Sequence, residues 1–176
     1  MKRSLKKGFT LIELLVVIAI ISVLLGVVAI TLNPLERIKE GRDSRRQQDL
    51  QNVKKAIDLA LADGEITLVS LTTSRNSENN GTSLQLDASN QTSGGWVLVE
   101  APSGKTGLIK YLPVLPADPS PVSGGSGNGY QYMSNGSCYQ LGAEFETAKF
   151  TPLHTSDGGN ENSVWEIGSC IGTLSF

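Results

Sequence analysis

The sequence predicts an α+β protein in which a long N-terminal helix is followed by a small antiparallel β-sheet head. The first observation is a run of 19 residues without a charge, Leu14–Leu32. The second is an apolar stripe between Leu50 and Leu61, in steps of three and four, which indicates an amphipathic helix. The third is a series of short apolar stretches after Gly64, separated by turn-forming residues.

The apolar run is long enough to cross a membrane. Phe9–Leu32 would form a helix of about 36 Å, whereas the hydrocarbon core of a bilayer is about 30 Å thick. A secretory signal has a shorter apolar core and a cleavage site of small residues, which Ile30–Pro34 lacks. Basic residues precede the run and should hold the N-terminus in the cytoplasm: Lys2, Arg3, Lys6 and Lys7. We therefore expect a single-pass precursor in the cytoplasmic membrane.

One acidic residue, Glu13, lies inside this apolar segment. An unpaired carboxylate in lipid costs on the order of several kcal/mol, so Glu13 needs a partner. A polar residue near the end of a plain membrane anchor is the alternative, because Glu13 lies close enough to the cytoplasm for its side chain to reach water.

Residues 6–21 read KKGFTLIELLVVIAII and closely resemble the N-terminus of type IV pilins and of type II secretion pseudopilins. The resemblance implies a pilin-like fold. It also implies that a prepilin peptidase cuts after Gly8 and methylates the new N-terminal amine of Phe9. In the filament, the Glu13 carboxylate would then neutralise the Phe9 ammonium of a neighbouring subunit, which makes both charges acceptable as a pair.

The chain is expected to have four parts. These are a leader peptide at 1–8, a transmembrane or filament-core helix at 9–33, an amphipathic helix at 34–64 and a globular β-sheet head at 65–176. Pro34 either kinks a continuous helix or begins a new one, and we expect the kink. Gly64 is the expected C-terminal cap. The Leu50–Leu61 stripe should pack on the sheet of the head.

The stretch Gly41–Gln48 has no apolar face, so its charges are expected to face water or neighbouring subunits. A polyanion site is the alternative interpretation of Arg42, Arg45 and Arg46, but acidic neighbours such as Asp43 favour a solvated face. Removal of the leader would leave 11 basic and 17 acidic residues, a net charge of −6. This balance predicts no nucleic-acid partner.

Short strands joined by turns are expected after Gly64, at 66–71, 83–86, 95–100, 108–112, 130–134, 137–141 and 164–167. Asn135-Gly136 should form a two-residue hairpin turn. Residues 72–81 and 112–129 are expected as surface loops. The second loop contains Pro116-Ala117-Asp118-Pro119, which resembles an element of the major pseudopilin of type II secretion.

Cys138 and Cys170 are the only cysteines, and the expected topology places both outside the cytoplasm. An oxidising compartment favours one disulfide between them, worth about 3 to 4 kcal/mol, while two free buried thiols are the alternative. The single histidine, His154, is expected on a surface loop. No nucleophile has a recognisable catalytic context, so we expect no enzyme.

The C-terminal residues 157–161 are a candidate calcium loop. The resemblance to the major pseudopilin, which binds calcium in its C-terminal loop, singles out Asp157, Asn160 and Glu161 as ligands. Calcium prefers oxygen ligands on a bent loop, but the regular spacing of a calcium loop is missing. An Asp-Gly turn explains the segment more simply, and no other cofactor is expected.

The predicted function is that of a structural subunit, polymerised through its N-terminal helix into a type IV pilus outside the cell. The resemblance implies identical subunits, prepilin peptidase, an assembly ATPase and membrane platform proteins as partners. A pseudopilin of type II secretion, in a periplasmic pseudopilus, is the first alternative. A membrane-tethered binding module that never polymerises is the second.

Overall fold

The computed structural model describes residues 8–31, 33–86, 92–119 and 129–176 and divides into two compact units, Met1–Ile38 and Lys39–Phe176. Most of the predicted leader lies outside the described residues. The first unit contains helix α1 (Leu11–Thr31) and the start of helix α2 (Pro34–Ala62). The second unit contains the rest of α2 and the β-sheet head, so the predicted α+β class is confirmed.

The helix is interrupted, not kinked, between α1 and α2. Asn33 adopts a left-handed backbone conformation with φ of 41°, and its carbonyl accepts hydrogen bonds from the backbone N–H of Glu36 and Arg37. Pro34 occupies the first position of α2, where its missing N–H costs nothing. The expected kink is therefore wrong, since Pro34 begins a new helix.

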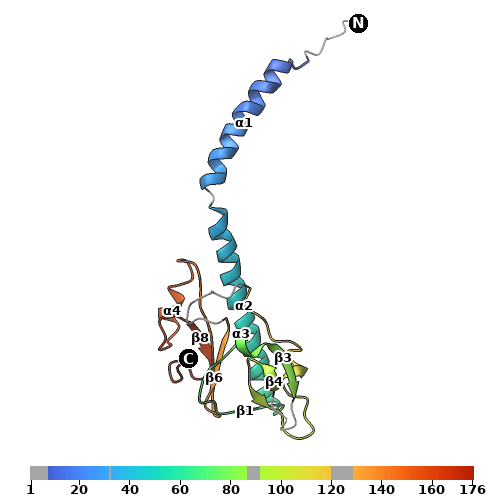
Figure 1. Cartoon of the computed structure of the whole chain (residues 1–176), viewed down its shortest axis with the longest axis vertical. Helices are drawn as coiled ribbons and strands as arrows, with labels where there is room; N and C mark the ends of the chain where they lie inside the picture. Colours follow the sequence, from blue (N-terminus) through green and yellow to red (C-terminus); the bar gives the residue numbers. More distant parts are fainter. Residues whose placement is uncertain (1–7, 32, 87–91, 120–128) are drawn as a thin grey trace, which may run out of the picture. The chain divides into compact units, whose positions relative to one another are not determined.

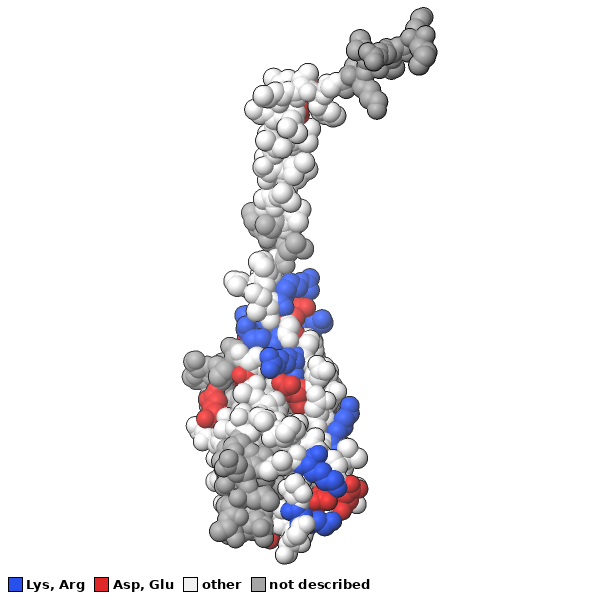
Figure 2. Space-filling model, turned by 90° about the vertical axis from the view of Figure 1, so that its right-hand side faces the viewer, with Lys and Arg blue, Asp and Glu red and all other residues white. Residues whose placement is uncertain are grey.

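Helix α1 has an exposed apolar surface. None of the window Leu11–Val28 is buried, and within the described residues this is the one helix long and apolar enough to cross a membrane. Figure 2 shows uncoloured surface along most of α1, whereas Lys, Arg, Asp and Glu gather on the first turns of α2 and on the head. Water is a poor solvent for this helix.

The apolar stripe of α2 forms one side of the core of the head. Leu50, Val53, Ile57 and Ala60 are fully buried and pack in one cluster with Tyr132 and other residues of the sheet, as predicted. In Figure 1 this half of α2 lies among the strands. The helix ends at Ala62, and Gly64, with φ of 62°, allows Glu65 N to donate to the Ala60 carbonyl.

The described part of the head contains a four-stranded antiparallel sheet and two antiparallel pairs (Figure 1). The large sheet has the order β2 (Arg75–Asn76), β6 (Gln131–Ser134), β7 (Tyr139–Ala143) and β8 (Trp165–Gly168). The pairs are β1 (Thr67–Leu68) with β5 (Val99–Glu100), and β3 (Thr82–Leu86) with β4 (Thr92–Gly95). Short helices are α3 (Ser77–Asn80), the 3-10 helix η1 (Gly107–Lys110) and α4 (Leu153–Ser156).

Several segments differ from the predicted strands and loops. The predicted strand 95–100 is divided, because β4 ends at Gly95 and β5 contains only Val99–Glu100. The predicted strand 108–112 is largely the 3-10 helix η1, because Gly107 turns the chain with φ of 77° and Leu108 then enters the core. The predicted loop 72–81 contains β2 and α3. There Asn76 caps α3 by accepting a hydrogen bond from Asn79 N, and Ser77 N bonds to the Tyr130 carbonyl.

The predicted hairpin is present as β6 and β7, but its turn is longer than expected. Ser134 pairs with Tyr139, which leaves a four-residue connection instead of two. Within it, Asn135 Oδ1 accepts hydrogen bonds from the backbone N–H of Ser137 and Cys138, each at 3.0 Å. Asn135 N also donates to the Cys138 carbonyl at 3.2 Å, so the side chain and the backbone of Asn135 close the connection together.

Candidate functional site

The first functional region is the start of α1. Gly8, Phe9 and Thr10 precede the helix and are exposed, and the Phe9 side chain is 86% accessible. The peptide bond between Gly8 and Phe9 therefore lies in an accessible, non-helical segment. A peptidase needs such a segment, because a bond inside a helix is held by backbone hydrogen bonds.

Glu13 is bound by Thr10 of the same chain. Thr10 N and Thr10 Oγ1 both donate to Glu13 Oε2 at 2.8 Å, and Glu13 N donates to Thr10 Oγ1 at 3.3 Å. This reciprocal arrangement is a capping box, which satisfies backbone N–H groups that the first turn of a helix leaves free. Sequence reasoning missed Thr10, although the spacing Thr-x-x-Glu is the pattern by which capping boxes are found.

The second region is a group of charged residues that we call the Arg46 cluster, comprising Arg42, Asp43, Arg46, Asp118 and Glu146. The Arg46 guanidinium bonds to Asp118 through Nε and Nη2, each at 2.8 Å. Its Nη1 donates to Asp43 Oδ1 at 2.8 Å and to Glu146 Oε1 at 2.6 Å. Three carboxylates from separate parts of the chain thus converge on one arginine.

Asp43 and Arg46, at the centre of the Arg46 cluster, are buried, contrary to the prediction that these charges face water or neighbouring subunits. Arg46 is 1% exposed and Asp43 is fully buried. The prediction failed because the residues that cover them, Asp118 and Glu146, lie 72 and 100 positions from Arg46. The spacing of three between Asp43 and Arg46 indicated a pair on one helix face, but not its burial.

The charges of the cluster support one another. Burial opposes the charged form of Arg46, but its bonds to Asp118, Glu146 and Asp43 raise its pKa above the ordinary value. Arg42 binds both carboxylate oxygens of Glu146, and with Arg46 it lowers the pKa of Glu146 to about 2. Glu146 is therefore ionised at any physiological pH, which a buried ion group requires.

Asp43 also organises the segment after β7. Its carboxylate accepts hydrogen bonds from Glu146 N at 3.0 Å, Thr147 N at 2.9 Å and Thr147 Oγ1 at 2.7 Å. A single side chain of α2 thus satisfies two consecutive backbone N–H groups of this loop. Buried backbone N–H groups without a partner are costly, so Asp43 defines where the loop lies.

Two tyrosines of the hairpin add further bonds to α2. Tyr130 Oη donates to Asp49 Oδ2 at 2.8 Å, and Tyr139 Oη donates to Asp58 Oδ1. Burial, and then the neighbouring carboxylate, raises the pKa of each tyrosine. The phenols therefore stay protonated and act as donors.

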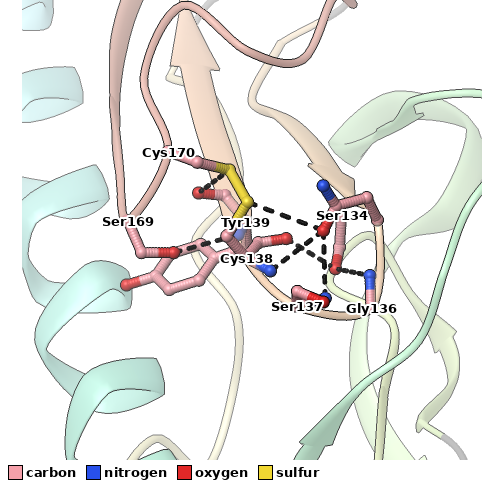
Figure 3. The surroundings of a disulfide bond; sticks show 8 residues. Ser134, Gly136, Ser137, Cys138, Tyr139, Ser169 and Cys170 are labelled. Carbon is pink, nitrogen blue, oxygen red and sulfur yellow. Dashed lines mark hydrogen bonds between the residues drawn. A yellow bond between two sulfur atoms is a disulfide. The ribbon is translucent and has the colours of Figure 1, made fainter.

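The predicted disulfide is present between Cys138 and Cys170, with an S–S distance of 2.16 Å and a Cα–Cα distance of 5.7 Å. Figure 3 shows that Ser169, which is next to Cys170, lies close to Tyr139, which is next to Cys138. Tyr139 N donates to Ser169 Oγ, and Ser169 N donates to the Tyr139 carbonyl, each at 3.0 Å. The disulfide thus joins the residue before β7 to the segment after β8.

His154 is buried, not on the surface as predicted. Its side chain is 3% exposed and stacks on the Phe145 ring, with 5.3 Å between the ring centroids. Its Nε2 accepts a hydrogen bond from Phe145 N. Burial lowers its pKa, against the opposing effect of Asp157 and Asp43. The burial of His154 could not be predicted from the residues next to it, because Phe145 and Trp165, which form the aromatic cluster, come from other segments.

The candidate calcium residues take part in bonds within the protein. Asp157 accepts hydrogen bonds from Gly159 N at 2.8 Å and Glu166 N at 2.6 Å, and the Asn160 amide contacts Ser175 Oγ. Glu161 N donates to the buried carboxylate of Glu166. In the described part of the chain, no group of three or more His, Cys, Asp or Glu side chains is placed to hold a metal ion. Calcium at this loop stays a prediction.

Comparison with protein families finds one match, the prokaryotic N-terminal methylation motif, at residues 3–29. The matched residues include the exposed Gly8-Phe9 junction, the Thr10–Glu13 capping box and most of α1. Searches of curated proteins and of solved structures find no match to this chain.

Proposed function

We propose that this chain, which carries the N-terminal methylation motif that is the hallmark of type IV pilins and pseudopilins, is a structural subunit of a type IV pilus. The motif and the apolar helix fit a membrane-anchored, pilin-like or pseudopilin precursor, and they indicate a structural subunit rather than an enzyme. The motif is the observation that carries the proposal.

Processing in this proposal separates the leader from the helix. Prepilin peptidase cuts after Gly8 and methylates Phe9, and the exposed, non-helical junction supports access to this bond. The cut creates an ammonium group at Phe9, four residues before Glu13. In the membrane, the capping box with Thr10 supports the Glu13 carboxylate until a neighbouring subunit supplies its Phe9 ammonium.

Assembly then exchanges lipid for protein around α1. None of the window Leu11–Val28 of α1 is buried, and residues such as Leu14 and Ile18 are more than half exposed. Identical helices of other subunits cover the same apolar surface that lipid covers before assembly. An ATPase and membrane platform proteins supply the work of extraction, and the filament reaches the cell exterior.

A pseudopilin of type II secretion is the second candidate, and the Pro116–Pro119 element favours it. This element resembles one in the major pseudopilin, and Asp118 within it is bound to α2 by Arg46. The element is thus part of the framework of the head. Calcium bound by Asp157, Asn160 and Glu161 belongs to this candidate, with a short periplasmic filament as the location.

Intact-mass and N-terminal analysis of the protein in sheared cell-surface material and in the membrane fraction tests the proposal. A chain that begins at methylated Phe9 in the sheared fraction is the expected result. A processed chain confined to the membrane fraction would favour the pseudopilin. A chain that keeps residues 1–8 in every fraction would contradict both and leave the membrane-tethered binding module.

A further inference from the structure

The Arg46 cluster is the first buried attachment of α2 to the head, counted from the N-terminal side. The buried side chains of α2 begin with Asp43 and Arg46 and reach apolar Leu50 only afterwards. Leu35 and Ile38, earlier in the helix, are 71% and 56% exposed. An earlier contact, between Glu40 and Lys149 at 3.5 Å, is on the surface. The apolar core therefore holds only the later turns of α2.

Arg46 joins α2 to the two segments that flank the β6–β7 hairpin. Asp118 lies before β6 in the chain, and Glu146 lies just after β7. These strands are the two central strands of the four-stranded sheet. A single side chain is thus bonded to both connections of the hairpin, and Asp43 holds the second connection through its backbone.

We propose that Arg46 is a positioning residue for assembly, through which a pull on the N-terminal helix reaches the head. This inference rests on the proposed function, in which the helix is drawn out of the membrane. A pull from the N-terminal side loads the first attachment before the later ones, and that attachment is the Arg46 cluster. The cluster prevents the first turns of α2 from peeling away and keeps the head in one orientation on its helix.

Arginine suits this role and lysine does not. The guanidinium presents five N–H donors in a rigid fork, and Arg46 uses Nε, Nη1 and Nη2 to bind three carboxylates at once. An ammonium keeps the charge that the buried carboxylates need, but it cannot bind Asp118 through two parallel bonds. Arg46→Lys should therefore loosen the attachment without removing the charge balance of the head.

Arg46→Lys in the full chain, with Arg45→Lys as matched control, tests the proposal. Arg45 is the neighbouring residue, its side chain is 65% exposed, and it forms an ion pair with Asp49 at 3.6 Å. Hydrogen exchange of the chain in lipid nanodiscs is measured by mass spectrometry. The amount of processed protein in sheared filaments and in membranes is measured in cells.

For Arg46→Lys we expect exchange at residues 42–49, 115–119 and 144–147 to rise at least about tenfold more than in β6, β7 and β8. Cleavage after Gly8 should be unchanged, and sheared filaments should fall at least about tenfold. Asp118→Asn should show the same local pattern. Arg45→Lys should resemble the wild type in every measurement.

Two results would overturn the inference. One is normal filament yield of Arg46→Lys despite faster local exchange. The other is an equal rise of exchange throughout the head, which would make Arg46 a general stability residue. Failure of the proposed function is distinguishable, because the wild-type chain itself would then remain uncleaved or absent from filaments.

Discussion

Glu13 and Arg46 are both charged side chains in helices, but their partners come from different distances along the chain. Glu13 is bound by Thr10, three residues away, inside the first turn of α1. Arg46 is bound by Asp118 and Glu146, which the fold brings from 72 and 100 positions away. A local partner forms with the helix itself, whereas a distant partner exists only after the head has folded. Glu13 is therefore supported before assembly and Arg46 only in a complete head.

The largest expected effect is the loss of filaments in Glu13→Ala. If Glu13 pairs with the Phe9 ammonium of a neighbour, its removal leaves that cation unpaired in an apolar filament core. Sheared filaments should fall at least about tenfold, as quantified by immunoblot of sheared and membrane fractions. Ser22→Ala is the control, since the Ser22 hydroxyl donates to the Ile18 carbonyl of its own helix.

Normal filament yield in Glu13→Ala would show that the carboxylate serves only the capping box. The two charged residues would then differ in role as well as in the distance of their partners.

The next effect is on the stability of the head. Arg46→Met should lower the free energy of unfolding by about 3 to 5 kcal/mol, because it leaves buried carboxylates without their cation. Urea unfolding of the full chain in detergent, followed by the fluorescence of Trp96 and Trp165, measures this change. Arg45→Gln should change it by less than about 0.5 kcal/mol, as expected for an exposed residue.

If Arg46→Met lowers the free energy of unfolding by less than about 1 kcal/mol, the stability of the head does not depend on the charge of Arg46. The methionine side chain would then stabilise the folded head as much as the ion pairs of Arg46 do.

The disulfide provides a covalent comparison with the Arg46 cluster. Replacement of both Cys138 and Cys170 by Ala should lower the free energy of unfolding by about 3 to 4 kcal/mol, from the entropy of the closed loop. The same urea experiment measures it. The triple variant Cys138→Ala, Cys170→Ala, Arg46→Met should lose free energy of unfolding equal to the sum of the two effects, because the disulfide and the cluster share no residue. Strong non-additivity would show that they form one unit.

A smaller effect concerns pH. Burial lowers the pKa of His154, so the unfolded chain binds its proton at about pH 6.5 and the folded chain only at lower pH. The stability that results from this difference is present above about pH 6.5 and is lost as pH falls below that value. Urea unfolding at a series of pH values should show a flatter curve for His154→Gln, which keeps an acceptor for Phe145 N. Equal curves would exclude His154 as the source.

The smallest effect is expected for Thr10→Val, which removes the capping hydroxyl but keeps the shape. Loss of an N-cap costs about 0.5 to 2 kcal/mol of helix stability. Hydrogen exchange of the first turn of α1 in lipid nanodiscs should increase, and Thr10→Ser should resemble the wild type. Unchanged exchange in Thr10→Val would show that the lipid environment, not the capping box, holds this turn.

Local patterns made much of the molecule predictable. The uncharged run predicted α1, and the stripe at Leu50–Leu61 predicted the buried face of α2. Gly64 predicted where α2 ends. The N-terminal motif was readable for the same reason, since its residues are consecutive. A pair of cysteines in a head that was expected to lie outside the cytoplasm was enough to predict the disulfide.

Features that depend on distant partners were not predictable. The burial of Asp43 and Arg46 requires Asp118 and Glu146, and the burial of His154 requires Phe145. Leu108 entered the core through a 3-10 turn instead of a strand, because an apolar residue near a glycine fits either conformation. In each case the composition near the residue was compatible with two environments, and the rest of the chain decided between them.

The disulfide also has a consequence for the edge of the sheet. Cys138 precedes β7 and Cys170 follows β8, the outermost strand beside β7. The covalent bond therefore limits how far β8 can separate from β7 when the hydrogen bonds between these two strands open.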